Sequence, residues 1–250
     1  MLRVENLNKS FGGVVATSDV SIDFPKESLS AVIGPNGAGK TTFFNLISGA
    51  LQPDSGRILL DGENIVGKSS IDIVRLGIGR AFQVAKLFKT LTVEESLRGA
   101  LLSPLGKSAS LSGRFPLAQT RDRAHEVMEQ LGLHHKANVV SGNLSHGDQK
   151  LLDMALALVL SPKVLLLDEP VAGMGPEERE QMIDTVYGLW KRGGLTIVLI
   201  EHDMEIVFKI SQNIHVLSYG RVLAEGTPEQ IKTNPAVIEA YLGTPRETNA

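Results

Sequence analysis

Apolar and polar residues alternate near the N-terminus of the chain, and the pattern changes further along. Val20, Ile22 and Phe24 are separated by single polar residues, which is the period of a strand with one buried face. An apolar run over 29–33 then leads into a glycine-rich segment. A helix is predicted to follow over 41–48, because a glycine comes directly after it and favours a helix end.

The middle of the chain is predicted to be mainly helical. A short strand over 57–60 and the hairpin dipeptide Asp61-Gly62 come before it. Apolar residues recur at helical spacing over 124–131, and a second, more apolar helix is predicted over 150–160. The stretch 103–116 is rich in Ser, Gly and Pro and is predicted to be a surface loop.

Strands and helices alternate again after residue 160. The apolar runs 164–167 and 195–200 lack alternation, which is typical of strands buried on both faces. A helix is predicted to begin at Pro176 between them. Thr227 opens a capping box, and a last short helix is predicted over 235–242.

This order of elements predicts an α/β protein in which a helical lobe interrupts a strand-bearing core. We expect one domain over 1–250. Its parts would be a core over 1–83 and 161–226, a helical lobe over about 84–160, and short C-terminal helices over 227–250.

Composition and net charge exclude several classes of function. Twenty-five basic and 28 acidic residues give a net charge of −3, which argues against a protein held to nucleic acid by phosphate neutralisation. Cysteine is absent, so disulfides and thiolate chemistry are excluded. We expect no secretory signal, because the N-terminus has no apolar h-region. We expect no membrane span, because the apolar runs are shorter than the roughly 20 residues that a span needs.

The glycine-rich segment carries the most specific motif. The run from Gly34 to Thr41 fits GxxxxGK[ST] between a predicted strand and a predicted helix. Backbone amides of such a loop surround phosphate oxygens, while the lysine reaches the β- and γ-phosphates and the hydroxyl binds Mg²⁺. The alternative is an ordinary glycine turn. The candidate nucleotide-binding residues are Gly34, Pro35, Asn36, Gly37, Ala38, Gly39, Lys40, Thr41 and Thr42.

Two adjacent carboxylates, Asp168 and Glu169, follow the apolar strand over 164–167. In a phosphate-binding enzyme the first would hold the metal shell and the second would orient or deprotonate the attacking water. A strand that ends in a polar turn is the alternative. The pair lies 128 residues after Lys40, and its occurrence with the glycine-rich loop favours the catalytic interpretation.

Five segments together resemble the ATP-binding-cassette (ABC) ATPases along nearly the whole chain. The glycine-rich loop is similar to the family's Walker A motif, and 164–170 is similar to its Walker B motif with its glutamate. Gln83 matches the Q-loop glutamine, and His202 matches the switch histidine. Leu144-Ser-His-Gly-Asp148 stands where the family has LSGGQ.

The resemblance implies a fold and a role for each residue. The fold would be a P-loop core with an N-terminal antiparallel β subdomain and an inserted helical lobe. Lys40 and Thr41 would bind phosphate and Mg²⁺, Asp168 would hold the metal through water, and Gln83 would join the metal shell and sense the nucleotide. Glu169 would polarise the attacking water and His202 would touch the γ-phosphate. Phe11 would stack on adenine, with a core aromatic as the alternative.

The resemblance also implies an ATP site completed across a dimer. Ser145 and Gly147 would cap the γ-phosphate of a partner subunit's ATP. Three positions depart from the family pattern. His146 replaces a signature glycine, Asp148 replaces the glutamine, and Gly175 stands where a D-loop aspartate is usual. These departures concern contacts across the dimer rather than nucleotide binding.

Three classes of function compete for such an ATPase. An ATPase that acts on ribosomes would carry two cassettes, one that acts on DNA would carry a long coiled coil, and a P-loop kinase would need neither the signature segment nor His202. The chain therefore resembles the ATP-hydrolysing subunit of a membrane transporter. Segments such as Gly77–Gln83, Leu87–Ser96, Glu169–Met174 and Glu239–Gly243 are similar to uptake ATPases for branched-chain amino acids or urea.

The expected assembly follows from that resemblance. Its members would be a second ATPase subunit, identical or not, integral membrane permeases and, indirectly, a substrate-binding protein. The chain would lie peripherally on the cytoplasmic face of the inner (plasma) membrane, with the exposed face near 84–88 against a permease helix. A lipopolysaccharide-type exporter ATPase is the alternative, although it usually has Pro-Gln where this chain has Phe82-Gln83.

Overall fold

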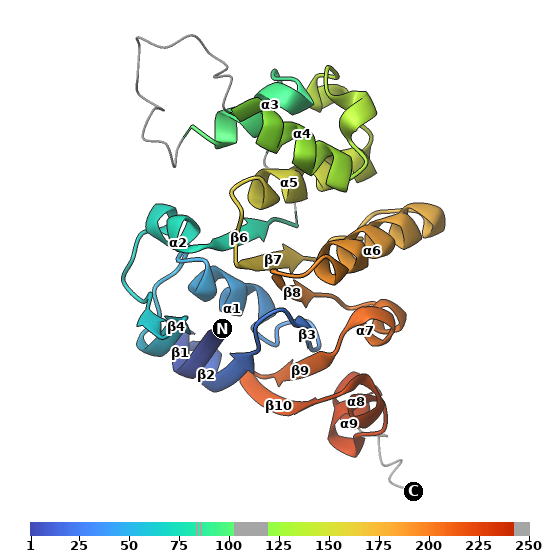
Figure 1. The fold of residues 1–250 in the computed structure, drawn as a ribbon. Coiled ribbons are helices and arrows are strands. Elements are labelled where there is room, and N and C mark those ends of the chain that lie inside the picture. The colour runs from blue at the N-terminus through green and yellow to red at the C-terminus, as the bar shows by residue number, and fades with distance from the viewer. Residues whose placement is uncertain (84, 86, 103–119, 243–250) are drawn as a thin grey trace, which may run out of the picture. The chain divides into compact units, whose positions relative to one another are not determined.

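A computed structural model describes residues 1–83, 85, 87–102 and 120–242 of the chain (Figure 1). Contacts divide the protein into two compact units, Met1–Ser70 with Thr196–Ala250 and Ile71–Leu195. They are called unit 1 and unit 2 below. The loop predicted over 103–116 lies outside the described residues.

Unit 1 contains an antiparallel sheet near its N-terminus, with strands in the order β2-β1-β4-β5. Strands β1 (Leu2–Phe11), β2 (Val14–Phe24), β4 (Ser55–Leu60) and β5 (Glu63–Asn64) form it. Val20, Ile22 and Phe24 are buried, as their alternation predicted. Asp61 and Gly62 both have positive φ, 50° and 88°, which is the geometry of the tight turn predicted for this dipeptide.

Unit 1 also contains the parallel strands that support the glycine-rich loop. β3 (Leu29–Ile33) lies between β8 (Thr196–Ile200) and β9 (Asn213–Ser218), parallel to both, and β10 (Arg221–Gly226) pairs antiparallel with β9. Every residue of β3 and β8 is buried, as expected for a strand covered on both faces.

Four helices accompany these strands in the part of unit 1 that the structure describes. They are α1 (Lys40–Ile47), α7 (Met204–Ile210), α8 (Pro228–Lys232) and α9 (Pro235–Leu242). Thr227 caps α8 with the capping box that its sequence predicted.

Unit 2 contains the parallel strands β6 (Ile78–Ala81) and β7 (Val164–Asp168). Its helices are α2 (Ser70–Leu76, which begins at the last residue of the first segment of unit 1), α3 (Val93–Ala100), α4 (Arg121–Gln130), α5 (His146–Leu158) and α6 (Pro176–Lys191). Two 3₁₀ turns, η2 (His134–Lys136) and η3 (Ser141–Asn143), lie between α4 and α5.

The helix predicted over 150–160 begins four residues earlier, at His146. Ser145 is its N-cap and accepts a hydrogen bond from the Asp148 amide, so a polar capping signal, rather than the first apolar residue, sets the start. Unit 2 is larger than the lobe expected over 84–160, because it also contains β6, β7 and α6. The division into core and lobe stays a prediction. Within the described residues, no helix combines the length and the apolar character that crossing a bilayer requires.

Candidate nucleotide-binding site

The glycine-rich loop joins β3 to α1 in unit 1, as predicted. Gly34, Gly37 and Gly39 have positive φ of 152°, 81° and 99°. A Cβ on Gly34 would lie 2.1 Å from the Leu217 carbonyl oxygen, and one on Gly39 would lie 2.2 Å from the Ala16 carbonyl oxygen. These two positions therefore need glycine both for their backbone conformation and for the close approach of neighbouring strands.

Lys40 begins α1 directly after this loop. Its ammonium donates hydrogen bonds to the carbonyl oxygens of Gly34, at 2.6 Å, and Pro35, at 3.1 Å. The side chain thus curves over its own loop, where phosphate oxygens would be held. The first turn of α1 contains no acidic residue, so its amides and helix dipole favour an anion.

α1 is fixed from beneath by Phe43, Phe44, Leu46 and Ile47, which are buried. Thr41 is exposed and Thr42 is partly exposed. The hydroxyl of Thr41 is therefore available to a metal ion beside the loop.

Two further candidate residues belong to unit 1. Phe11 ends β1 and is 47% exposed, with the Lys9 ammonium 5.5 Å from its ring centroid. The alternative of a core aromatic is therefore wrong for Phe11. His202 follows β8 and is exposed, beside the buried Glu201.

The C-terminal helix α9 contributes Tyr241 to the region of the loop. Burial of the Tyr241 hydroxyl raises its pKa to about 12, although the nearby Gly34 backbone amide opposes the rise. The phenol therefore stays neutral at physiological pH, and α9 lies against the start of the loop.

Unit 2 holds the two carboxylates that follow β7. Asp168 is 5% exposed and accepts a hydrogen bond from the Arg80 guanidinium at 2.8 Å. Register explains the pair, because Ala81 pairs with Leu167 and the two parallel strands end side by side. Arg80 compensates the buried negative charge of Asp168, as a buried carboxylate requires.

Glu169 and Gln83 are brought together by the structure. The Gln83 side-chain amide donates to a Glu169 carboxylate oxygen at 2.6 Å. Glu169 also has φ of 50°, a left-handed conformation that is uncommon for a residue with a side chain. Such strain at a charged residue is characteristic of functional sites.

The signature segment forms the N-terminus of α5. The Ser145 hydroxyl donates to the Asp148 carboxylate at 2.6 Å and accepts from the Asp148 amide at 3.2 Å. Lys136 forms an ion pair with the same carboxylate. The unexpected acidic residue of the signature is therefore neutralised within its own unit. Gly147 is buried beside Glu178.

The charge of Asp148 is stabilised by its neighbours. Partial burial acts to raise its pKa, but hydrogen bonds from Lys136 and Ser145, and the charges of Lys136 and His135, outweigh it. The net pKa of Asp148 lies below its usual value, so Asp148 is ionised at neutral pH.

His146, one of the departures from the family pattern, lies beside the segment after Walker B. The His146 Nε2 atom lies 3.2 Å from the Ala172 carbonyl oxygen. A Cβ on Gly173, which has φ of 79°, would lie 3.1 Å from the same nitrogen. The large residue in the signature thus meets a glycine in the segment after Walker B.

Sequence reasoning missed several residues that support the site. Arg80 belongs to the segment Gly77–Gln83, but its own role was not predicted. No motif marks Lys136, Lys150 or Asp153. Lys150 and Asp153 are each 5% exposed, and the side chain of Arg80 is 7% exposed. A charge within an otherwise apolar helical pattern is the signal that points to such residues.

Strand, glycine-rich loop and helix in unit 1, with paired carboxylates after a strand in unit 2, define a P-loop nucleotide-binding protein. The family model described as ABC transporter matches residues 17–172. A second model, described as branched-chain amino acid ATP-binding cassette transporter, matches residues 221–247. The chain belongs to the ABC transporter family, and it is an ATP-hydrolysing subunit of the ABC type.

Similar proteins and structures agree with this assignment. The high-affinity branched-chain amino acid transport ATP-binding protein LivG of Escherichia coli is 41% identical over 97% of this chain and 98% of its own length. The corresponding protein BraF of Pseudomonas aeruginosa is 40% identical with the same coverage. A nucleotide-free ATP-binding cassette from an ABC transporter has a TM-score of 0.87 and 33% identity over 97% of this chain and 99% of that one.

A cassette in its ADP conformation gives the same TM-score of 0.87, with 33% identity over 97% of this chain and 98% of that one. The predicted family, fold class and ATPase activity are confirmed.

Proposed function

We propose that this chain powers the uptake of branched-chain amino acids, or of a related small polar solute, through a separate permease. The observation that carries the proposal is the similarity to LivG and BraF over almost the full length of each protein. The C-terminal match over residues 221–247 supports it, because this segment lies outside the part that the general family model covers.

The site residues receive their roles in the same proposal. The loop 34–42 and Lys40 bind the phosphates, with Phe11 against the adenine. Glu169 polarises the attacking water, and His202 contacts the γ-phosphate. The hydrogen bond from Gln83 to Glu169 supports a link between the Q-loop and hydrolysis, since a shift of Gln83 would move the carboxylate that it holds.

The donor set fits Mg²⁺, a hard cation that prefers oxygen ligands. Thr41 of unit 1 would offer a hydroxyl, and Asp168 of unit 2, which also accepts from Arg80, would offer a carboxylate. Gln83 donates to Glu169 through its nitrogen, which leaves its amide oxygen for a cation. When bound, the metal neutralises charge on the β- and γ-phosphates.

The complete site is proposed to form between two ATPase subunits, identical or not. Ser145 and Gly147 cap the γ-phosphate held by the partner subunit. The N-terminus of α5 supports this role through its amides and dipole. The dimer acts with integral membrane permeases and, indirectly, with a substrate-binding protein, on the cytoplasmic face of the plasma (inner) membrane. No nucleic acid takes part.

The variant Glu169→Gln tests the hydrolytic role. We expect it to bind ATP normally, to hydrolyse ATP about 10²–10⁴ times more slowly than the wild type, and to accumulate as an ATP-bound dimer. Phosphate release and size-exclusion chromatography with ATP measure these effects. Glu180→Gln, the same change on an exposed turn of α6, is the matched control. Normal turnover by Glu169→Gln would remove Glu169 from this role.

Transport itself needs the membrane partners. Reconstitution with its partner permeases and binding protein should give ATP-dependent uptake of labelled leucine into vesicles. Outward movement of lipopolysaccharide by the reconstituted complex would instead support the exporter alternative.

A further inference from the structure

Two charged side chains of α5 are buried away from the signature segment. Lys150 and Asp153 are each 5% exposed, and they lie three residues apart, hence on one face of the helix. α5 packs against β6 and β7, the two parallel strands of unit 2. Because buried charges are costly without polar partners, the partners of these two residues indicate what the helix holds.

Lys150 holds the backbone of the hydrolytic residue. Its ammonium donates a hydrogen bond to the Glu169 carbonyl oxygen at 3.0 Å. Glu169 is the residue with the left-handed φ of 50°, a conformation that persists only when neighbouring groups enforce it. The bond from Lys150 is such a constraint, and it fixes the direction in which the Glu169 side chain leaves the backbone.

Asp153 holds the start of the Q-loop. Its carboxylate accepts a hydrogen bond from the Phe82 amide at 2.6 Å. The next residue, Gln83, donates through its side chain to the Glu169 carboxylate at 2.6 Å. One face of α5 therefore restrains the backbone of Glu169 and the backbone next to the glutamine that touches it.

We propose that Lys150 and Asp153 are positioning residues for hydrolysis. They tie the catalytic carboxylate and the Q-loop to the helix whose N-terminus carries the signature segment. The inference rests on the proposed roles of Glu169, Gln83 and Ser145. Helix α5 therefore connects Ser145 to Glu169. A nucleotide of the partner subunit that binds at Ser145 also restrains the position of Glu169 in this subunit, because both residues are held by the same rigid helix.

The test compares removal of each polar group with its conservative replacement. Lys150→Met keeps the aliphatic stem but loses the ammonium, and Asp153→Leu keeps the volume but loses the acceptor. We expect kcat for ATP hydrolysis to fall at least about tenfold in both, since small displacements of catalytic groups cost this much or more. KM for ATP, and the equilibrium affinity for a fluorescent ATP analogue, should stay within about twofold of the wild type, because the two residues bond to the backbone of Glu169 and Phe82, which lie outside the loop 34–42.

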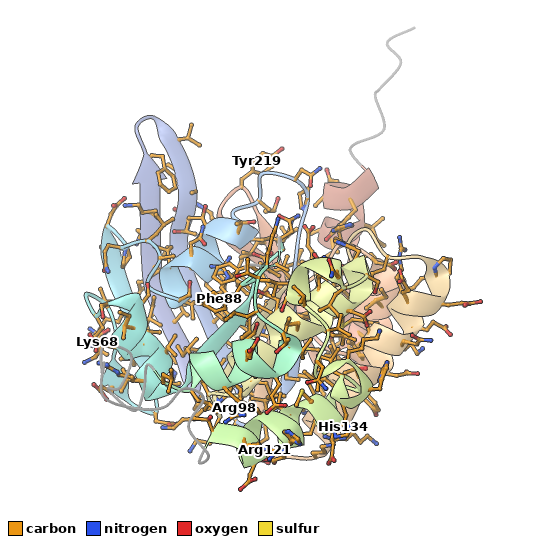
Figure 2. The ribbon with its side chains drawn as sticks, turned by 90° about the horizontal axis from the view of Figure 1, so that it is seen from above. Lys68, Phe88, Arg98, Arg121, His134 and Tyr219 are labelled. Carbon is orange, nitrogen blue, oxygen red and sulfur yellow. The ribbon has the colours of Figure 1, made fainter. Side chains whose placement is uncertain are left out.

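Lys150→Arg and Asp153→Asn keep a donor and an acceptor, and they should recover most of the lost kcat. The matched control is Arg98→Met. Arg98, labelled in Figure 2, is 9% exposed and pairs with Glu94 at 2.7 Å on α3. Its loss should lower the melting temperature while kcat stays near the wild-type value, which separates positioning from general stability.

Three outcomes would overturn the inference. The first is a kcat within about twofold of the wild type in folded Lys150→Met and Asp153→Leu. The second is the absence of recovery in the conservative variants, and the third is an equal loss of kcat in Arg98→Met. If Lys150→Met does not fold, the Asp153 pair decides. Failure of the proposed function gives a different result, since the wild type would then not hydrolyse ATP or Glu169→Gln would hydrolyse it normally.

Discussion

Asp148 shows how a single charge can be accommodated in an unfavourable place. A carboxylate near a partner's phosphates would repel them, but Asp148 is paired with Lys136 and bonded to Ser145. Its negative charge is thus neutralised locally, while the Ser145 hydroxyl keeps its position at the start of α5. The signature departs from the family pattern in sequence, yet the N-terminal geometry of its helix is retained.

The pH dependence of unfolding tests this arrangement. The pKa of Asp148 is lower in the folded protein than its usual value, so the carboxylate stabilises the fold fully above about pH 3.9. This stabilisation is lost as pH falls from there through the folded pKa. Lys136→Met should make unfolding less sensitive to pH in this acidic range.

Melting temperatures between pH 3 and pH 6 measure this effect, with Lys136→Arg as the control that keeps the charge. In the same variants, Lys136→Met should weaken ATP-driven dimerisation of Glu169→Gln, because the carboxylate is left uncompensated. If the melting temperature of Lys136→Met falls with acid pH as steeply as that of the wild type, the ion pair between Lys136 and Asp148 does not stabilise the fold.

At the scale of elements, the contact between α5 and the segment after β7 shows how the His146 departure is accommodated. His146 needs space beside residue 173, and a glycine provides it. The segment after Walker B therefore depends on what the signature carries, and substitutions at the two positions should be coupled.

A double-mutant cycle measures this coupling. Gly173→Ala should destabilise unit 2 by about 1–3 kcal/mol, because alanine tolerates the positive φ poorly and its Cβ meets the imidazole. His146→Ala should remove only the contribution from the contact between the new Cβ and the imidazole. We therefore expect an interaction energy of about 0.5–1 kcal/mol between the two substitutions. Chemical denaturation gives both values, and Gly67→Ala, at φ of 84° with open space, isolates the backbone cost. Strict additivity would show that the two residues do not meet.

Elements with their own sequence signal were predictable, and those formed by pairing were not. The strand around Val20–Phe24, the helix from Pro176 and the capped helix after Thr227 carry periodicity, proline or capping residues. β6 has the sequence Ile-Gly-Arg-Ala, which has no strand pattern of its own. It forms a strand because it pairs with β7. β10 alternates only between exposed and partly exposed residues. α7 was missed although Asp203 caps its start, a signal visible in the sequence.

The candidate site followed the same division. The loop around Lys40 and the carboxylates after β7 are contiguous motifs, so their residue types and order reveal them. Arg80, Lys136, Lys150 and Asp153 act through partners that are distant in sequence, 88 residues away for Arg80 and Asp168. Spacing along a chain carries no information on such pairs, and only the folded backbone brings them together.

At the scale of the whole molecule, ATP hydrolysis must be coupled to a permease. We predict that the surface around Phe88 makes this contact; residues 84 and 86 of the segment 84–88 lie outside the described residues. Phe88, labelled in Figure 2, is 56% exposed, so its ring is accessible to a partner.

Phe88→Ser should therefore lower transport at least about tenfold in the reconstituted complex while the ATPase activity of the purified chain stays within about twofold. Leu223→Ser on β10, another exposed apolar residue at 37%, is the control and should change neither. Transport at the wild-type rate by Phe88→Ser would place the docking surface elsewhere.

The crowding around the phosphate loop has a consequence for synthesis of the chain. The carbonyl oxygens of Leu217 and Ala16 lie close to Gly34 and Gly39 respectively. The Gly220 amide donates to the Ala38 carbonyl at 3.1 Å. The loop therefore cannot take its final form on the ribosome until the hairpin around Gly220 has emerged. We therefore expect a nascent chain whose first half alone has been translated to bind ATP weakly, because it contains the whole phosphate motif but lacks these contacts.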